Sequence, residues 1–232
     1  MDKKLGTLYI VSTPIGNLSD ITYRAIETLE SVNIIAAEDT RKSRILLSHY
    51  NVKTRTISYF EHNKFQKIDK IKQVLKKGDS VALITDAGTP GISDPAYKLI
   101  RKAIEIGCKV ESIPGPSAVI ASLVSSGLPT DRFIFEGFLP PKKGRKRRME
   151  SLKEETATIV IYENVNRLQR TIKQLLDIMG DRPAVICREL TKLHEETIRG
   201  TLSSLLNLLN DRKLKGECVL LIGKDDKNVY FE

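Results

Sequence analysis

The sequence contains no apolar run of about 18 residues, the length that a membrane-spanning helix requires. Its N-terminus also lacks the basic stretch followed by an apolar stretch that marks a secretory signal. These two absences predict a soluble intracellular protein without a membrane partner, and we expect it in the cytoplasm.

Cysteine and histidine are scarce. The three cysteines, Cys108, Cys187 and Cys218, lie far apart and show no C-x-x-C spacing, and the three histidines are equally scattered. Disulfide frameworks and structural zinc sites need such residues in paired or closely spaced groups. The sequence therefore predicts neither, and we expect no metal site.

The chain has an excess of positive charge. Its 232 residues include 38 Lys or Arg and 29 Asp or Glu, which gives a formal net charge of +9 and a pI near 9.4. An excess of this kind favours a polyanionic partner such as nucleic acid. The alternative is a well-mixed, lysine-rich surface, which would give the same totals.

Apolar runs alternate with amphipathic stretches through the first half of the chain. Residues 8–11, 34–37, 81–84 and 110–113 are short and almost continuously apolar, as in parallel strands covered on both faces. Between the second and third of these runs, apolar residues recur at helical spacing until Gly78 supplies a stop. The pattern predicts an α/β sandwich.

The second half has further candidate elements. The expected strands are residues 133–135, 158–162, 184–187 and 218–222, and the expected helices are residues 165–176 and 202–209. The segment IPGPSA is a candidate hinge, because Pro114 and Pro116 restrict the chain around Gly115. We therefore predict two α/β domains, residues 1–114 and 115–232, with a cleft between them.

The segment TDAGTPGIS, residues 85–93, joins a predicted strand to a predicted helix. Asp94 followed by Pro95 predicts the start of that helix. Its expected buried stripe is Ile100, Ala103 and Ile104. The loop thus lies at the carboxyl end of a strand, where open α/β sheets bind their ligands. The alternative is that its glycines, prolines and aspartates merely turn the chain.

The side chains of this loop favour one kind of ligand. A phosphate-binding loop presents backbone amides and a lysine, whereas this loop and its helix cap carry Asp86 and Asp94. Neither G-x-x-x-x-G-K-[ST] nor G-x-G-x-x-G occurs in the chain. We expect a cation, a ribose or an amine, and S-adenosylmethionine offers a sulfonium, an amino group and a ribose without phosphate. A Mg²⁺ ion held by the aspartates is the alternative.

Eight segments spread along the chain carry a family resemblance. They are YIVSTPIGNLSDITYRAIETL, AAEDTRKSRILL, LITDAGTPGISDPAY, IPGPSAVIASL, GFLPPK, YENVNR, RELTKLHEETIRGT and KGECVLLI. In this order they resemble the tetrapyrrole methylase superfamily, and within it the branch that acts on ribosomal RNA. The resemblance implies two α/β domains, S-adenosylmethionine bound in the cleft between them, and a homodimer. It also implies methylation of the ribose 2′-hydroxyl of a cytidine in the decoding region of 16S ribosomal RNA.

The resemblance also assigns residues to the cofactor. It places Pro14 in the first cofactor-facing loop and Ser117 and Ala118 at a later helix start. From the loop at residues 85–93 it assigns Asp86, Ala87, Gly88, Ile92 and Ser93, and from the second domain it assigns Phe138, Leu139 and Tyr162.

Methyl transfer to a hydroxyl would gain from a general base. The candidates are His62 in YFEHNK and Glu163 in YENVNR. The alternatives are that His62 is a surface residue at a helix entrance, and that Glu163 holds Arg167 one helical turn later.

Several residues are candidates for contact with the RNA. Asp39 would orient Arg41, and with Asn63 and Lys64 they would contact phosphate or ribose. The run PPKKGRKRRMESLKEE, residues 140–155, could form a basic flap that contacts the RNA backbone through Arg145, Arg147 and Arg148. Arg167 completes the set, and Tyr59 or Phe60 could stack on bases. The alternatives are solvated ion pairs for the charges and core positions for the two rings.

The sequence thus predicts an S-adenosylmethionine-dependent 2′-O-methyltransferase of 16S ribosomal RNA. Two alternatives are a small-molecule methylase of the tetrapyrrole type and a non-catalytic RNA-binding module. A Mg²⁺-dependent phosphate enzyme is the third.

Overall fold

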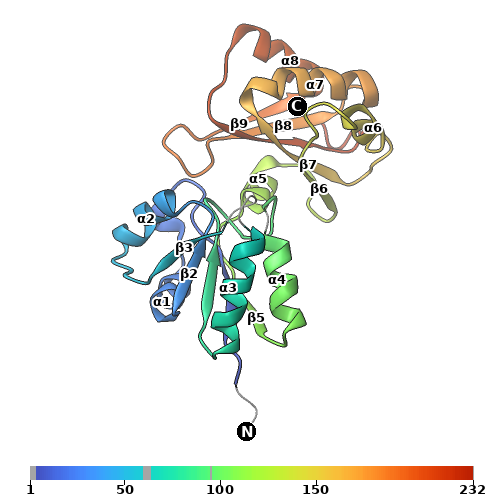
Figure 1. Cartoon of the computed structure of the whole chain (residues 1–232). Helices are drawn as coiled ribbons and strands as arrows, with labels where there is room; N and C mark the ends of the chain where they lie inside the picture. Colours follow the sequence, from blue (N-terminus) through green and yellow to red (C-terminus); the bar gives the residue numbers. More distant parts are fainter. Residues whose placement is uncertain (1–3, 60–63, 95, 232) are drawn as a thin grey trace. The chain divides into compact units, whose positions relative to one another are not determined.

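The structure, a computed structural model, describes residues 4–59, 64–94 and 96–231. The chain forms two compact units, Met1–Ser117 and Ala118–Glu232, each built on a five-stranded sheet (Figure 1). The predicted α/β class with two sheets is confirmed. The division between the units lies three residues after the boundary placed at residue 114 from the sequence.

The sheet of the first unit has the strand order β3-β2-β4-β1-β5, and every neighbouring pair is parallel. Its strands are β1 (Thr7–Val11), β2 (Ile34–Ala37), β3 (Thr56–Ser58), β4 (Val81–Ile84) and β5 (Lys109–Ile113). The four predicted strands are confirmed. Only β3 was missed, because its three half-buried residues form no apolar run.

Helices cover both faces of this sheet. They are α1 (Tyr23–Ser31), α2 (Thr40–His49), α3 (Lys64–Lys76) and α4 (Ala96–Glu105), with a short 3₁₀ turn at Leu18–Asp20. Alternate residues of each strand face opposite sides. Leu83 therefore packs in one cluster with residues of α3 and α4, while Ile84 packs in another with residues of α1 and α2.

The buried stripe of α4 differs from the prediction. Its core residues are Ala96, Leu99 and Ala103, whereas Ile104 is 60% exposed. Positions 96, 99 and 103 lie on one helical face, and Ile104 follows one residue too late to join it.

The second unit has a mixed sheet of order β6-β7-β10-β8-β9. Its elements are α5 (Ala118–Ser126), β6 (Phe133–Phe138), α6 (Arg145–Glu150), β7 (Thr158–Asn164), α7 (Val165–Met179), β8 (Pro183–Arg188), β9 (Glu196–Thr201), α8 (Leu202–Asp211) and β10 (Glu217–Ile222). β6 and β7 are parallel and the other pairs are antiparallel. The four predicted strands and two predicted helices are confirmed, and the half-exposed edge strand β9 was missed.

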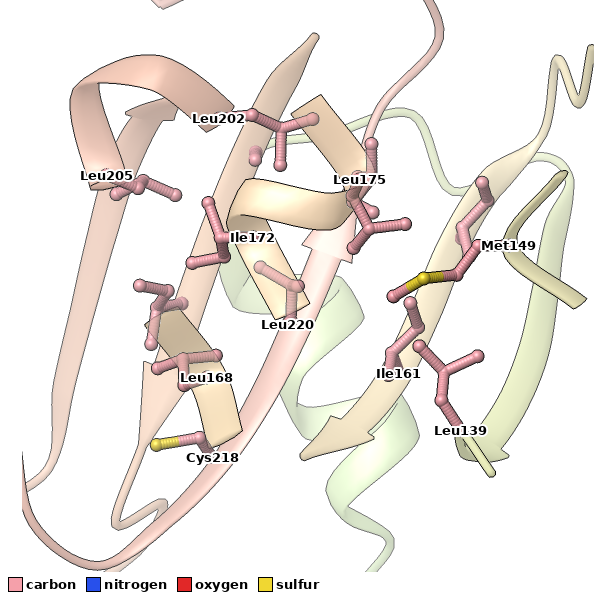
Figure 2. Close-up of a cluster of buried hydrophobic side chains, with 14 of the residues drawn as sticks. Leu139, Met149, Ile161, Leu168, Ile172, Leu175, Leu202, Leu205, Cys218 and Leu220 are labelled. Atoms are coloured by element: carbon pink, nitrogen blue, oxygen red, sulfur yellow. The ribbon is translucent and has the colours of Figure 1, made fainter. Parts of the chain in front are cut away.

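The main core of this unit lies between the sheet and the helices α6, α7 and α8. Figure 2 shows Met149 of α6 beside Ile161 of β7, and Leu168, Ile172 and Leu175 along α7. Cys187 and Cys218, like Cys108 in the first unit, are buried free thiols, and burial raises the pKa of Cys218 to about 11. Within the described residues, every helix is too short or too polar to span a bilayer.

Candidate functional site

Hydrogen bonds join the loops that follow β1 and β4 at one edge of the first sheet. The backbone N–H of Thr13 donates to the carbonyl of Gly88 at 2.9 Å, and the N–H of Gly88 donates back to the carbonyl of Thr13 at 3.0 Å. The Thr13 hydroxyl adds longer contacts of 3.4 Å to the carbonyls of Gly88 and Thr85. Because all five strands are parallel, this is the carboxyl edge, where such sheets bind ligands.

The loop after β5 is tied to the same place. The Thr89 hydroxyl donates to the carbonyl of Pro116 at 3.2 Å, and the Ser12 hydroxyl lies 2.9 Å from the Thr89 hydroxyl. The Ser12 N–H donates to the carbonyl of Ile113 at 3.2 Å. Residues from three separate loops therefore form one connected edge.

Gly88 is required by the shape of this edge. Its φ is +77°, and a Cβ placed there would lie 3.4 Å from Cγ2 of Ile15 and 3.8 Å from the carbonyl oxygen of Pro116. Ser93 also has a positive φ, of 64°, which is uncommon for a residue with a side chain. Strained backbone of this type persists where surrounding structure holds it, and it is frequent in ligand-binding loops.

Asp94 organises the end of the loop, as predicted. Its carboxylate accepts hydrogen bonds from the N–H of Ala96 at 2.8 Å and from the N–H of Gly91 at 2.7 Å. The first of these caps α4. Burial raises the pKa of Asp94 despite these bonds. Pro95 lies outside the described residues.

A second carboxylate, Asp86, links this loop to the start of α2. Its Oδ1 accepts from the N–H of Asp39 at 3.1 Å and its Oδ2 from Nζ of Lys42 at 2.6 Å. The N–H of Asp86 lies 3.4 Å from Oε2 of Glu38. Burial raises the pKa of Glu38, and the negative charges of Asp86 and Asp94 add to this effect. Adding a cation would relieve this repulsion, whereas adding a phosphate would increase it.

Asp39 orients Arg41, as the sequence predicted. Its carboxylate accepts from the backbone N–H of Arg41 at 2.9 Å, from Nε at 3.1 Å and from Nη2 at 2.8 Å. These bonds hold the pKa of Asp39 well below its usual range. The Arg41 side chain is nevertheless 87% exposed. Its guanidinium is thus fixed along one edge and presents the other to solvent.

The structure gathers most of the residues assigned to the cofactor in the first unit. Pro14 follows the Thr13 bridge, Ser117 follows Pro116, and the remainder belong to the loop after β4. Ala87, Ile92 and Ser93 are exposed, and Pro14, Asp86 and Ser117 are half-buried. Ala118, also half-buried, begins α5.

In the second unit, Phe138 and Tyr162 are cross-strand neighbours on β6 and β7. Their ring centroids are 5.6 Å apart in an edge-to-face arrangement, and Phe138 is exposed. Burial raises the pKa of Tyr162. Leu139 differs from the prediction, because its side chain is 1% exposed and packs beside Met149 and Ile161 in the core (Figure 2).

The structure corrects the assignment of Glu163 as a general base. Its side chain is fully buried, and Oε1 accepts from Nε of Arg167 at 2.8 Å and from Nη2 at 2.7 Å. Oε2 accepts from Oγ1 of Thr171 at 2.7 Å and lies 3.4 Å from Nη2 of Arg145. The carboxylate is enclosed by two guanidiniums and a threonine hydroxyl, so no substrate hydroxyl reaches it. The alternative interpretation, that Glu163 holds Arg167, is the one that the structure confirms.

The structure also separates the arginines of the basic run. Arg145 is 3% exposed and donates to Thr171 at 2.6 Å, to Gln174 at 2.9 Å and to the carbonyl of Pro140 at 3.2 Å. It was predicted to contact RNA, and this is wrong because its donors are used inside the unit. Arg147 and Arg148 are both exposed, and the guanidinium of Arg148 donates to the carboxylate of Glu136.

Some predicted residues cannot be placed. His62, Asn63 and Phe60 lie outside the described residues, as does the side chain of Lys64. Tyr59 is described and is a core residue, and burial raises its pKa to about 12. It offers no free ring for stacking.

Sequence reasoning missed the polar side chains that join the loops. Ser12, Thr13 and Thr89 make the connecting hydrogen bonds, and Glu38 and Lys42 flank Asp86. The sequence did contain a signal for Ser12 and Thr13. They directly follow the apolar run of β1, just as the loop that begins at Thr85 directly follows the apolar run of β4.

Comparisons with known proteins agree with this arrangement. The family model of the tetrapyrrole (corrin/porphyrin) methylases matches residues 7–206. The chain belongs to the tetrapyrrole methylase family. This confirms the resemblance inferred from the eight segments.

Relatives and solved structures in this family extend the match. The chain is 46% identical over 222 residues to a Thermotoga maritima protein named ribosomal RNA small subunit methyltransferase I, covering 95% of this chain and 100% of that protein. It is 44% identical to the Bacillus subtilis protein of the same name over 230 residues, covering 98% and 79% of the two chains. A cobalt precorrin-4 methyltransferase of cobalamin biosynthesis has the same fold, with a TM-score of 0.70 at 17% identity, covering 94% of each chain.

The methyl donor in this methyltransferase family is S-adenosylmethionine. The residues at the carboxyl edge fit it chemically. Their carboxylates suit an amino group, a sulfonium or ribose hydroxyls, and the glycine at position 88 leaves room beside Ile15 and Pro116.

Gly88→Val should abolish S-adenosylmethionine binding, because the added side chain would occupy the space beside Ile15 and strain the loop. Isothermal calorimetry measures the binding, and circular dichroism checks the fold. Gly144→Val is the matched control, since Gly144 also has a positive φ, of 81°, but a Cβ added there would meet no atom within 4 Å. Unchanged affinity in a folded Gly88→Val protein would contradict the assignment.

Glu163→Leu should lower the free energy of unfolding by about 3–5 kcal/mol, because it leaves the buried Arg145 cation without its carboxylate. Urea denaturation followed by circular dichroism measures this. Glu150→Leu, which removes the exposed partner of Lys146, should change stability by less than about 0.5 kcal/mol. If Glu163 were instead a general base, Glu163→Gln would lose methyl transfer while stability and substrate affinity stayed unchanged.

Proposed function

We propose that this protein transfers the methyl group of S-adenosylmethionine to the ribose 2′-hydroxyl of a cytidine in the decoding region of 16S ribosomal RNA. One observation carries the proposal. The carboxyl edge of the first sheet holds a glycine-containing, carboxylate-bearing loop fixed by the Thr13 and Gly88 backbone bonds. It does so in a chain that matches proteins named ribosomal RNA small subunit methyltransferase I over almost its full length.

The chain's own residues would act mainly by positioning. S-adenosylmethionine supplies an activated methyl group on a sulfonium. Asp86, held by Lys42 and by the N–H of Asp39, is already oriented to accept a hydrogen bond or face a positive charge. Phe138 and Tyr162 remain proposed contacts in the second unit. Alignment of a nucleophile can supply on the order of 7 kcal/mol or more of rate acceleration.

A general base would add roughly 10²- to 10⁴-fold. With Glu163 buried and paired to two arginines, His62 is the remaining candidate.

The net charge of +9 favours RNA as the methyl acceptor over a small tetrapyrrole. In the basic run, Lys142, Lys143 and Arg147 are exposed and are the proposed phosphate contacts, with Arg41 as a fixed contact near the carboxyl edge. Arg148 and Arg167 would contribute only through donors not already used by Glu136 and Glu163.

We also propose a cytoplasmic homodimer. The apolar side chains of Ile120 and Val124 on α5 and of Leu193 before β9 are exposed in the second unit, and they are candidates for contact with a second copy of the chain.

Methyl transfer to 16S ribosomal RNA tests the proposal directly. Protein and labelled S-adenosylmethionine are incubated with free 16S RNA and with small ribosomal subunits, and primer extension locates 2′-O-methylation nucleotide by nucleotide. We expect one modified cytidine in the decoding region. Transfer only to a tetrapyrrole would indicate a small-molecule methylase, and RNA binding without binding of S-adenosylmethionine would indicate a non-catalytic module.

Replacing Lys142, Lys143 and Arg147 by glutamine should weaken RNA binding and reduce the salt dependence of log K by up to about 0.7 per lost phosphate contact. Filter binding at several salt concentrations measures this. A matched variant with glutamine at Lys53, Lys213 and Lys215, which are exposed elsewhere, should keep the wild-type slope. Equal salt slopes in both variants would show that the basic run does not contact RNA phosphates.

A further inference from the structure

A groove runs between α3 and α4 on the first unit, and none of its lining residues was assigned a role above. The two helices lie side by side in Figure 1, and their inner faces pack through Ile71, Leu75 and Leu99. The groove has a volume of about 310 Å³. Lys72 of α3 and Tyr97, Arg101 and Lys102 of α4 are among its lining residues.

Positive charge is concentrated on these helices. Residues 67–76 and 96–105 contain seven basic and two acidic residues, a net charge of +5, compared with +9 for the whole chain. Each acidic residue has a basic partner, Asp69 with Lys72 at 3.5 Å and Glu105 with Lys102 at 2.6 Å. The surplus is therefore positive, and it favours a polyanion.

The groove also carries an exposed aromatic ring. Tyr97 is 62% exposed, in the first turn of α4. Nη1 of Arg101 donates to its hydroxyl at 3.2 Å, and the guanidinium carbon lies 5.9 Å from the ring centroid. An exposed ring with a guanidinium held over it is a surface on which nucleic-acid bases stack. An anionic lipid surface or an acidic peptide would use the charge but would have no need of this arrangement.

The groove starts at the same edge of the sheet as the candidate site. In a parallel α/β unit each helix that follows a strand begins at the carboxyl edge. Helix α4 begins at Ala96, two residues after Asp94, and α3 begins at Lys64. Tyr97 thus lies close in sequence to the loop after β4, and the groove leads from that edge along the two helices.

We propose that this groove binds a single-stranded segment of the RNA substrate that flanks the methylated nucleotide. The identity of the RNA rests on the proposed function, whereas binding of single-stranded RNA by the groove does not depend on it. Bases stack on Tyr97 and Arg101, and Lys72 and Lys102 contact phosphates. The groove adds affinity and fixes the direction of the strand relative to the carboxyl edge.

The test measures binding of a short, unstructured, fluorescently labelled oligocytidylate by anisotropy. Tyr97→Ala should weaken binding by about 5-fold to about 100-fold, as expected for loss of one stacked base. Tyr97→Phe keeps the ring and should bind within about 2-fold of wild type. Lys72→Gln with Lys102→Gln should reduce the salt slope by up to about 1.4, for two lost single-strand contacts.

Matched controls lie elsewhere on the chain. Tyr23→Ala removes an exposed ring from α1, and Lys213→Gln with Lys215→Gln removes two exposed charges from the second unit. Both should bind the oligonucleotide like wild type. All variants should keep the wild-type circular dichroism spectrum and affinity for S-adenosylmethionine.

The outcomes separate this inference from the proposed function. If the wild-type protein methylates 16S RNA and both groove variants keep its RNA affinity and its KM, the inference is overturned and the proposed function stands. Absence of methylation by the wild type, with RNA binding still lost in the groove variants, would overturn the proposed function and support the groove as an RNA site. Loss of binding to phosphatidylserine vesicles with unchanged RNA binding would assign the groove to a membrane surface and overturn the inference.

Discussion

The two reciprocal hydrogen bonds between the backbones of Thr13 and Gly88 are the constraint on which the candidate site depends. They make one connected edge from loops that are 75 residues apart in sequence. They also require Gly88 at a positive φ, close to Ile15 and Pro116. Once this bridge is fixed, the hydroxyl contacts of Ser12 and Thr89 bring in the loop after β5, and Asp86 brings in the start of α2. A parallel sheet places these loops at one edge, and the bridge gives them a fixed relative position.

In the second unit, the buried carboxylate of Glu163 and its partners likewise hold separate segments in a fixed relative position. The carboxylate of Glu163 is fully buried, and burying a charge is unfavourable unless its hydrogen-bonding capacity is satisfied. Arg145, Arg167 and Thr171 satisfy it. Because Arg145 belongs to α6, the same contacts attach the basic run to α7. The run therefore has a structural arginine pointing inward and exposed basic residues around it.

Charge of opposite sign is separated on the first unit. Glu38, Asp39, Asp86 and Asp94 lie at the carboxyl edge, while α3 and α4 carry a surplus of positive charge. A methyl donor with a sulfonium and an RNA acceptor with phosphates place opposite electrostatic demands on one protein. The carboxylates lie at the strand ends and the basic surplus lies on the two helices, so a different set of residues meets each demand.

The sequence by itself determined the strands with continuous apolar runs, the loop with Gly88 and Asp94, the pairing of Asp39 with Arg41, and the family. Each of these leaves a local pattern, because strand periodicity, helix caps and loop motifs depend on residues close together in the chain. Tertiary structure decided what has no such pattern. The strands β3 and β9 lack an apolar run. Leu139, which was assigned to the cofactor, is buried in the core, and Ile104, which was expected in the buried stripe of α4, is exposed. Arg145 and Arg147 stand two residues apart in one basic run, and only the packing of α6 against α7 buries the first beside Glu163 and leaves the second in solvent. Burial depends on the neighbour that arrives from a distant part of the chain, and a local sequence pattern does not specify that neighbour.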